Sequence, residues 1–271
     1  KFIGHAGFMY STSNEILLMD PWMSKNGAFD SSWFQFPSNH SLGEEIRQEV
    51  ESTTKEVYIY ISHEHKDHFD VDYLKTLNLS KVNFITPKFR RDHVASVLEK
   101  LDPKSVTTPI DSEVLNIGKM EIMLFLDDQE IVRDSAIGLK DFENDFTFLN
   151  LNDCKVYDRV DELKSIYKKF DVFTCQFSGA VFHPVCYEYP EKKYKEISES
   201  KVYGKFSSVK NLVSKFEPNL YVPAAGPPVF LDPNLISINY EEVNIFSSPF
   251  KFKNYLSEEM PNLNVEVPVP G

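Results

Sequence analysis

Apolar and polar positions along the chain follow two different periods. Short runs rich in β-branched and aromatic residues, each ended by Asp, Pro, Gly or Asn, are typical of strands. Between them apolar residues recur at helical spacing, and Ser41 and Glu44 predict a capping box at the first helix. The predicted strands cover residues 15–19, 56–62, 83–86, 119–125, 135–139 and 146–151. The predicted helices cover residues 41–51, 70–77, 91–101, 160–168 and 192–216.

This order of elements predicts the fold class. Strands interleaved with helices indicate an α/β protein, and many short, hairpin-like strands favour two packed sheets over one doubly wound sheet. We expect one domain over residues 1–255 and a proline-rich linker or edge-wrapping tail over residues 256–271. Because the chain opens at Lys1 without Met and enters a strand-like sequence at once, we also expect it to be a fragment of a longer protein.

Charge and cysteine content narrow the function. The 271 residues include 41 Asp and Glu against 29 Lys and Arg, a formal net charge of −12. General binding to nucleic acid or to an anionic membrane needs a surplus of Lys and Arg on one face, so the charge argues against both. The longest apolar runs are about six residues, far below the roughly 20 that span a bilayer. Cys154, Cys175 and Cys186 form no Cys-x-x-Cys pair, which predicts reduced thiols and a cytoplasmic location.

One segment concentrates metal-binding side chains. Residues 61–68 read Ile-Ser-His-Glu-His-Lys-Asp-His and follow an apolar strand directly. In extended backbone His63 and His65 point to the same side and can bind one metal ion. The following turn directs Asp67 and His68 toward a second ion. Since the chain has only 7 histidines, this H-x-H-x-D-H spacing predicts a dinuclear metal site rather than an unliganded polar loop.

With Asp20-Pro21-Trp22 upstream, the motif resembles that of the metallo-β-lactamase superfamily. The resemblance implies an αββα sandwich of two mixed sheets flanked by helices, with a dinuclear metal site at one edge. Four stretches are similar, in order, to the catalytic part of the CMP-N-acetylneuraminate hydroxylases. They lie at residues 20–22, 60–65, 151–154 and 223–226. The run Ala-Gly-Pro-Pro-Val-Phe-Leu-Asp-Pro at 225–233 resembles bacterial proteins that combine this fold with a Rieske iron–sulfur domain.

The resemblance also implies a ligand set, residue by residue. His63 and His65 map to metal 1, whereas Asp67 and His68 map to metal 2. Asp153 falls where the superfamily places its metal-bridging aspartate, although a turn aspartate that caps a strand end would occupy the same position.

Two further ligands depart from the superfamily pattern, which has a histidine at each place. Glu130 stands at the aligned position of the third metal 1 ligand, and Asp232 takes the place of the last metal 2 histidine. Three neighbours of Glu130 remain alternatives to it. They are Asp127, Asp128 and Asp134.

These departures have a chemical meaning. Three neutral histidines and four carboxylates shift the site toward hard oxygen ligands, which suit iron or manganese better than zinc, so we expect two iron ions. The function implied is a non-haem di-iron oxygenase that uses O2, a small-molecule substrate and a Rieske or ferredoxin-like electron donor, with Asp67 and Asp153 as catalytic residues. The alternatives are a dinuclear metallohydrolase of the lactonase or phosphodiesterase type and a non-catalytic descendant that binds metal weakly.

Five other residues are candidates for substrate contacts or for supporting the ligands. Asp20 ends a strand where it could orient a metal-binding histidine through its free ring nitrogen, or simply cap a turn. His5 fits a role near the metals as well as that of a core histidine. His183 and Tyr187 lie in an aromatic-rich loop that either lines a substrate pocket or packs as an ordinary loop. Arg133 could meet an anionic substrate or remain a surface arginine.

Overall fold

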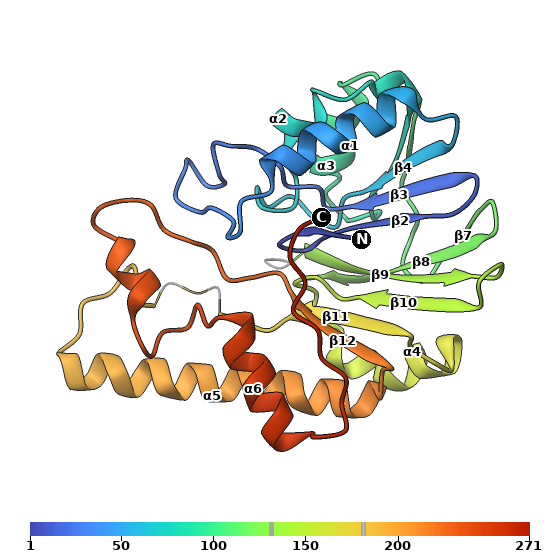
Figure 1. The fold of residues 1–271 in the computed structure, drawn as a ribbon. Coiled ribbons are helices and arrows are strands. Elements are labelled where there is room, and N and C mark those ends of the chain that lie inside the picture. The colour runs from blue at the N-terminus through green and yellow to red at the C-terminus, as the bar shows by residue number, and fades with distance from the viewer. Residues whose placement is uncertain (130–132, 180, 182) are drawn as a thin grey trace.

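Two six-stranded sheets lie face to face at the centre of the molecule (Figure 1). The computed structural model describes residues 1–129, 133–179, 181 and 183–271. The strands of the first sheet, in their order across the sheet, are β1 (Phe2–Gly4), β2 (Gly7–Ser11), β3 (Glu15–Met19), β4 (Glu56–Tyr60), β5 (Val82–Ile85) and β6 (Ser105–Thr107). Its first three strands are antiparallel, and β3 to β6 are parallel.

The second sheet is mixed in the same way. Its strands, in their order across the sheet, are β12 (Leu220–Ala224), β11 (Val172–Gln176), β10 (Phe146–Asn150), β9 (Arg133–Asp141), β8 (Met120–Asp128) and β7 (Val114–Ile117). Strands β7 to β10 are antiparallel, whereas β10, β11 and β12 are parallel.

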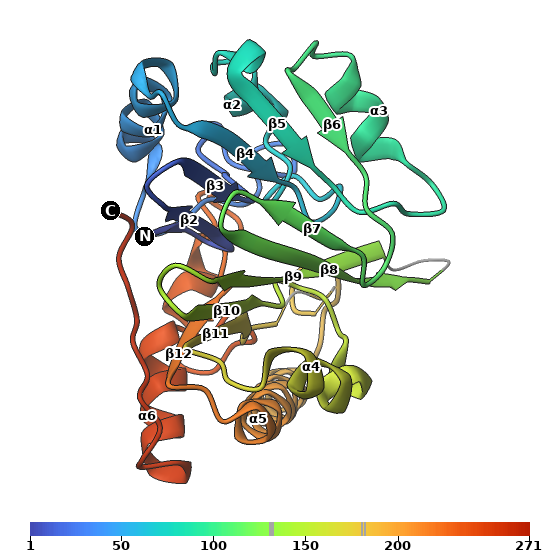
Figure 2. The same cartoon turned by 90° about the vertical axis from the view of Figure 1, so that its right-hand side faces the viewer.

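Helices cover the outer face of each sheet, as the two views show (Figures 1 and 2). The first sheet carries α1 (His40–Ser52), α2 (Val71–Leu74) and α3 (His93–Glu99). The second sheet carries α4 (Val160–Tyr167), α5 (Glu191–Phe216) and α6 (Pro249–Glu259). The predicted αββα sandwich of two mixed sheets is therefore confirmed.

The strands bury apolar residues on both of their faces, which explains their nearly continuous hydrophobicity. In β3, Leu17 and Met19 point into the core between the sheets, whereas Ile16 and Leu18 pack under the helices. Because successive side chains of a strand point to opposite faces, one apolar run serves two cores. Full burial of one such side chain stabilises the fold by about 1.5–3 kcal/mol.

Two of the predicted local features can be compared directly with the structure. The strand at 15–19 is confirmed, but the capping box at Ser41 is wrong because the helix begins at His40 after Asn39. The Asn39 side chain instead donates to the carbonyls of Ile3 and Trp22, at 2.7 and 2.9 Å, and so ties α1 to the start of the chain.

Among the residues that the structure describes, no helix combines the length and apolarity that crossing a membrane requires.

The end of the chain lies against the second sheet. The expected boundary at residue 255 falls inside α6, and Val265 then forms a parallel bridge with Tyr221 of β12. The Gly271 amide donates to the Phe2 carbonyl at 3.1 Å, so the two termini lie close together (Figure 1).

Candidate metal centre

The H-x-H-x-D-H segment leaves the carboxyl end of β4 and turns sharply. The Ile61 amide still bonds to the neighbouring strand, whereas the amides of His68 and Phe69 both donate to the His65 carbonyl, at 3.0 and 2.7 Å. This turn folds the segment back on itself. It therefore brings Asp67 and His68 beside the imidazole of His63 rather than further along the chain.

The first cluster of possible ligands joins two strand ends. His63 Nε2 lies 2.8 Å from His65 Nδ1 and 3.3 Å from Asp134 Oδ1, at the start of β9. His63 is 1% exposed, and the side chain of Asp134 is 11% exposed. The two histidines and the aspartate can therefore bind one ion, with His63 and Asp134 on its buried side and the exposed His65 on its solvent side.

Two more clusters adjoin the first. His5 Nε2 lies 3.1 Å from Asp67 Oδ2, and with His68 these side chains form the second cluster. Asp153, on the loop after β10, lies with Oδ2 3.7 Å from His68 Nε2 and completes a third cluster with His63 and His68. The third cluster shares one histidine with each of the others, so the three form one continuous centre.

Asp20 and Ser62 orient the two most buried histidines of the centre. The Ser62 hydroxyl donates to Asp20 Oδ2 at 2.5 Å and lies 2.9 Å from His63 Nδ1. Since a hydroxyl has one hydrogen, Ser62 must accept the Nδ1–H of His63. His68 Nδ1 lies 2.8 Å from Asp20 Oδ2, which can only accept. When either ring is neutral, its remaining hydrogen is therefore on Nδ1, and Nε2 directs its lone pair toward the centre.

Buried polar atoms without partners test whether the centre suits a cation. Among the described residues, four such atoms lie in the clusters. They are Asp67 Oδ1, His68 Nε2, Asp134 Oδ1 and Asp153 Oδ1. An unpaired buried polar group is costly, and such atoms are rarely left unsatisfied without a functional reason. Nitrogen and carboxylate donors that converge in this way fit a pair of divalent metal ions.

The electrostatics of the centre also favour positive charge. Burial and the neighbouring imidazoles of His68 and His65 hold the pKa of His63 well below its usual value, so this ring is neutral and able to bind metal. Burial opposes protonation of His68 as well, but the carboxylates of Asp67 and Asp153 outweigh it and raise its pKa to about 10. Burial, followed by the charge of Asp153, raises the pKa of Asp134 to about 7.

The backbone is strained around the centre. His5, Asp20, Asn152 and Ala225 all have positive φ, between 42° and 53°, which residues other than glycine seldom adopt. Such residues cluster at functional sites, where the surrounding structure holds them in place. Gly226 extends this region at φ 146°, and a Cβ on it would lie 2.2 Å from Ser178 Oγ.

A cavity of about 660 Å³ opens onto the metal centre. One part of its wall is apolar and aromatic, formed by Phe29, Trp33, Phe230, Phe246 and Leu235. Another part is polar, formed by Glu64, Arg133, Lys155, Gln176 and Ser178, while His5, His65, Asp67, Asp134 and Asp153 lie at the metal centre. A space of this size suits a small organic molecule.

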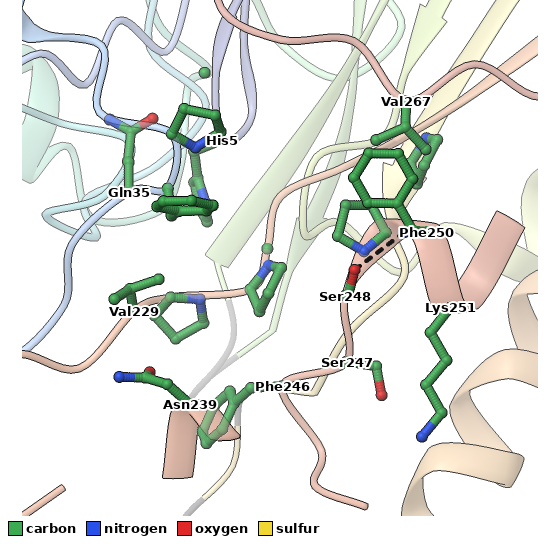
Figure 3. Close-up of a pocket in the computed structure, with 18 of the residues that line it drawn as sticks. His5, Gln35, Val229, Asn239, Phe246, Ser247, Ser248, Phe250, Lys251 and Val267 are labelled. Carbon is green, nitrogen blue, oxygen red and sulfur yellow. Dashed lines mark hydrogen bonds between the residues drawn. The ribbon is translucent and has the colours of Figure 1, made fainter. Parts of the chain in front are cut away.

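A second cavity of about 500 Å³ lies on the other side of the Gly226–Pro228 loop. Figure 3 shows His5 and Gln35 at one end of it, and Ser248, Phe250 and Val267 toward the other. His5, Gly226, Pro228 and Phe246 line both cavities. His5 therefore belongs to the wall between them.

The structure places the remaining predicted residues as follows. Glu130 lies outside the described residues. Asp232 is exposed, and its Oδ1 accepts the Asn234 amide at 2.7 Å, so it is not in any of the three clusters. Of the alternatives to Glu130, Asp128 accepts the Arg90 amide at 2.9 Å, whereas Asp134 reaches His63.

The aromatic-rich loop contributes less to the cavity than expected. His183 is buried against α5, where its Nε2 lies 2.9 Å from Ser198 Oγ, and Tyr187 is 53% exposed. Val185 and Cys186 of this loop line the cavity instead. Arg133 also lines it, but its guanidinium is paired with the Glu64 carboxylate.

Two features of the centre are not visible in the sequence pattern. The Ser62 hydroxyl sets the tautomer of His63. The one sequence feature that could have indicated this role is the position of Ser62 directly before the H-x-H motif. His5 joins the ligand cluster through a contact with Asp67, 62 residues away, whereas the sequence predicted for it only a role near the metals or in the core.

Comparison with known proteins finds relatives that are named for an iron–sulfur centre and solved structures that share the metallo-β-lactamase fold. The chain is 29% identical over 264 residues to a protein of Mycolicibacterium smegmatis named as a Rieske 2Fe-2S iron-sulfur protein. It is 30% identical over 260 residues to a protein of the same name in Mycobacterium tuberculosis. These matches cover 94% and 92% of the chain but 49% and 48% of the relatives, so it spans about half of their length. No protein-family model matches the sequence.

Two solved structures share the architecture over nearly the whole chain. CmlA of Streptomyces venezuelae, described as a diiron β-hydroxylase, superposes with a TM-score of 0.60 at 14% identity, covering 99% of this chain and 52% of CmlA. The metallo-β-lactamase fold protein YhfI of Bacillus subtilis superposes with a TM-score of 0.58 at 10% identity, covering 99% of this chain and 90% of YhfI.

Proposed function

We propose that this chain, which has the metallo-β-lactamase fold, is a non-haem di-iron oxygenase that oxidises a small organic substrate with dioxygen and external electrons. The observation that carries the proposal is the composition of the three clusters. Each combines two imidazoles with one carboxylate. Two histidines and one carboxylate are a donor set that non-haem iron oxygenases use, and carboxylate oxygens suit iron better than thiolates do.

The proposal gives each side chain a task. His63, His65 and Asp134 would hold the first ion, His68 and Asp67 would hold the second, and Asp153, which lies within reach of His63 and His68, would add a carboxylate to the centre. Bound iron supplies the activation of dioxygen, drawing on electrons from the donor. Asp20 and Ser62 keep the ring nitrogens of His63 and His68 free for metal.

The wall of the 660 Å³ cavity supports a substrate class. Phe29, Trp33 and Phe230 offer flat apolar surface that fits an aromatic or other planar apolar body. Lys155 lies two residues from Asp153 and brings positive charge to the rim beside the metal centre. We therefore propose a substrate with an apolar ring and an anionic group, the ring packing on Trp33 and the anion facing Lys155.

The relatives support an electron donor of Rieske type. The mycobacterial proteins are named for a Rieske 2Fe-2S centre, and the matched region accounts for about half of their length. CmlA is described as a diiron β-hydroxylase. We propose that a Rieske or ferredoxin-like centre reduces the metal ions of this chain.

The decisive experiment compares dioxygen consumption and hydrolysis by the iron-loaded and the zinc-loaded forms of the same protein. The chain is loaded anaerobically with Fe(II), its iron is counted, and the reduced protein is mixed with a measured amount of dioxygen. We expect about two iron ions per chain and dioxygen consumption that zinc-loaded protein does not show. Hydrolysis of lactones or phosphodiesters by the zinc form, without dioxygen consumption by the iron form, would instead establish the metallohydrolase.

A further inference from the structure

We infer that His5 is a ligand of the second metal ion and takes the place that the sequence pattern gives to Asp232. The inference rests on the proposed dinuclear centre and adds a residue to it. His5 lies in the turn between β1 and β2, 58 residues before the H-x-H-x-D-H motif begins, and no part of that motif points to it.

The position of the His5 ring supports direct metal binding. Its Nε2 lies 3.1 Å from Asp67 Oδ2, and its side chain is 5% exposed. One ligand atom from each of His5, Asp67 and His68 lies within 4.8 Å of the others, so a single ion can contact all three. The ring stands edge-on to Trp22 at 5.2 Å and to His68 at 5.4 Å, which limits its rotation.

The backbone brings His5 to the end of the last strand. The His5 carbonyl accepts the Ala225 amide at 3.0 Å, which joins the β1–β2 turn to the residue that directly follows β12. Ala225 and Gly226 have no side chain that can reach a metal. His5, which has φ 51°, lines the same cavity as Ala225 and Gly226 and is the one of the three with a metal-binding side chain.

Asp232 accepts hydrogen bonds within its own loop. Its carboxylate accepts the Asn234 amide at 2.7 Å, and its carbonyl accepts the amides of Leu235 and Ile236 at 2.9 and 2.8 Å. These bonds shape the exposed turn before the 3-10 helix Ile236–Tyr240. Asp232 thus stabilises a loop, and the ring of His5 is the group that completes the second cluster.

The substitution His5→Gly tests this assignment. Glycine adopts the positive φ of this position without strain, and the space left by the ring adjoins both cavities. The probe is Co(II), counted per chain after desalting and followed by its visible absorption. We expect two ions in the wild type, about one in His5→Gly, and recovery of the second ion when free imidazole is added. Asp232→Ala, the matched control, should keep two.

The outcomes separate this inference from the proposed function. Two ions in His5→Gly, or one ion without rescue by imidazole, would show that His5 is structural. Loss of one ion in Asp232→Ala would show that Asp232 is a ligand of the second ion. Fewer than two ions in the wild type would overturn the dinuclear centre itself. Circular dichroism of each variant establishes that the ions are counted on folded protein.

Discussion

Asp20 Oδ2 lies 2.8 Å from His68 Nδ1, and both side chains are completely buried. The same oxygen accepts the Ser62 hydroxyl, which in turn accepts from His63. One carboxylate oxygen therefore determines which nitrogen is free in two neighbouring histidines, whose ring centroids are 4.2 Å apart. Groups that fix the orientation and tautomer of a ligand in this way contribute measurably to metal affinity.

Asp20→Asn should weaken metal binding while leaving every proposed ligand in place. If the amide turns its nitrogen to this position, it can no longer accept from Ser62 and His68, so both rings lose the bond that directs Nε2 to the centre. We expect the dissociation constant for Co(II) to rise about 10- to 100-fold. Isothermal titration calorimetry on the metal-free protein measures this change.

Asp70→Asn is the matched control. Asp70 is also a buried carboxylate that accepts several hydrogen bonds, from the amides of Met23, Ser24 and Tyr73, but it bonds to no histidine. It should lower the free energy of unfolding and leave the Co(II) affinity of the folded protein unchanged. An equal loss of affinity in both variants would mean that Asp20 acts only through the general stability of the fold.

Local sequence predicted the parts of the centre that are contiguous in the chain. His63, His65, Asp67 and His68 lie within six residues, so the geometry of one strand and one turn places them together. The sandwich was predictable because alternating strands and helices can bury their apolar faces in only a small number of layered arrangements. These features depend on short-range patterns that a single sequence displays.

The distant ligands depend on strand pairing that the sequence does not display. Asp134 reaches His63 because β8 and β9 pair in the register that sets Asp127 opposite Asp134, and a shift by one residue would turn Asp134 to the other face. The path of the chain after β12 likewise decides where Asp232 lies. The Ser41 capping box failed for a similar reason, because Asn39 bonds to distant carbonyls and fixes where α1 begins.

Gly226→Ala should disturb the loop that separates the two cavities. A Cβ at this position would lie 2.2 Å from Ser178 Oγ, on a backbone with φ 146° that alanine avoids. We expect a loss of about 1–3 kcal/mol in the free energy of unfolding, as for other strained positions. Urea denaturation of the metal-free protein measures it.

The double variant Gly226→Ala/Ser178→Ala separates the two causes. Removing Ser178 Oγ relieves the contact but not the backbone strain, so we expect part of the stability to return relative to Gly226→Ala alone. Additive losses in the two single variants would contradict the predicted contact.

Trp33→Leu and Lys155→Gln should weaken ligand binding in different ways. We expect 3-phenylpropanoate to bind the wild type, with Lys155→Gln losing affinity for it but not for 3-phenylpropanol. Trp33→Leu should weaken both ligands by a similar factor because it removes ring contact without changing charge. Equilibrium dialysis with zinc-loaded protein measures this binding without turnover. Equal affinities of the acid and the alcohol for the wild type would argue against the anionic site.

Metal removal should lower the melting temperature most where the centre is intact. Ions that bind the folded state alone stabilise it by about 2.7 kcal/mol when their free concentration is 100 times the dissociation constant. The apolar cores of the fold consist of other residues than the clusters, so the metal-free chain should still unfold cooperatively. His63→Ala removes a histidine shared by two clusters, so a chelator should lower its melting temperature much less than that of the wild type. His93→Ala, a change at an exposed histidine on α3, should respond like the wild type. Differential scanning calorimetry with and without chelator provides the comparison, and an equal response in His63→Ala and His93→Ala would place the metal elsewhere.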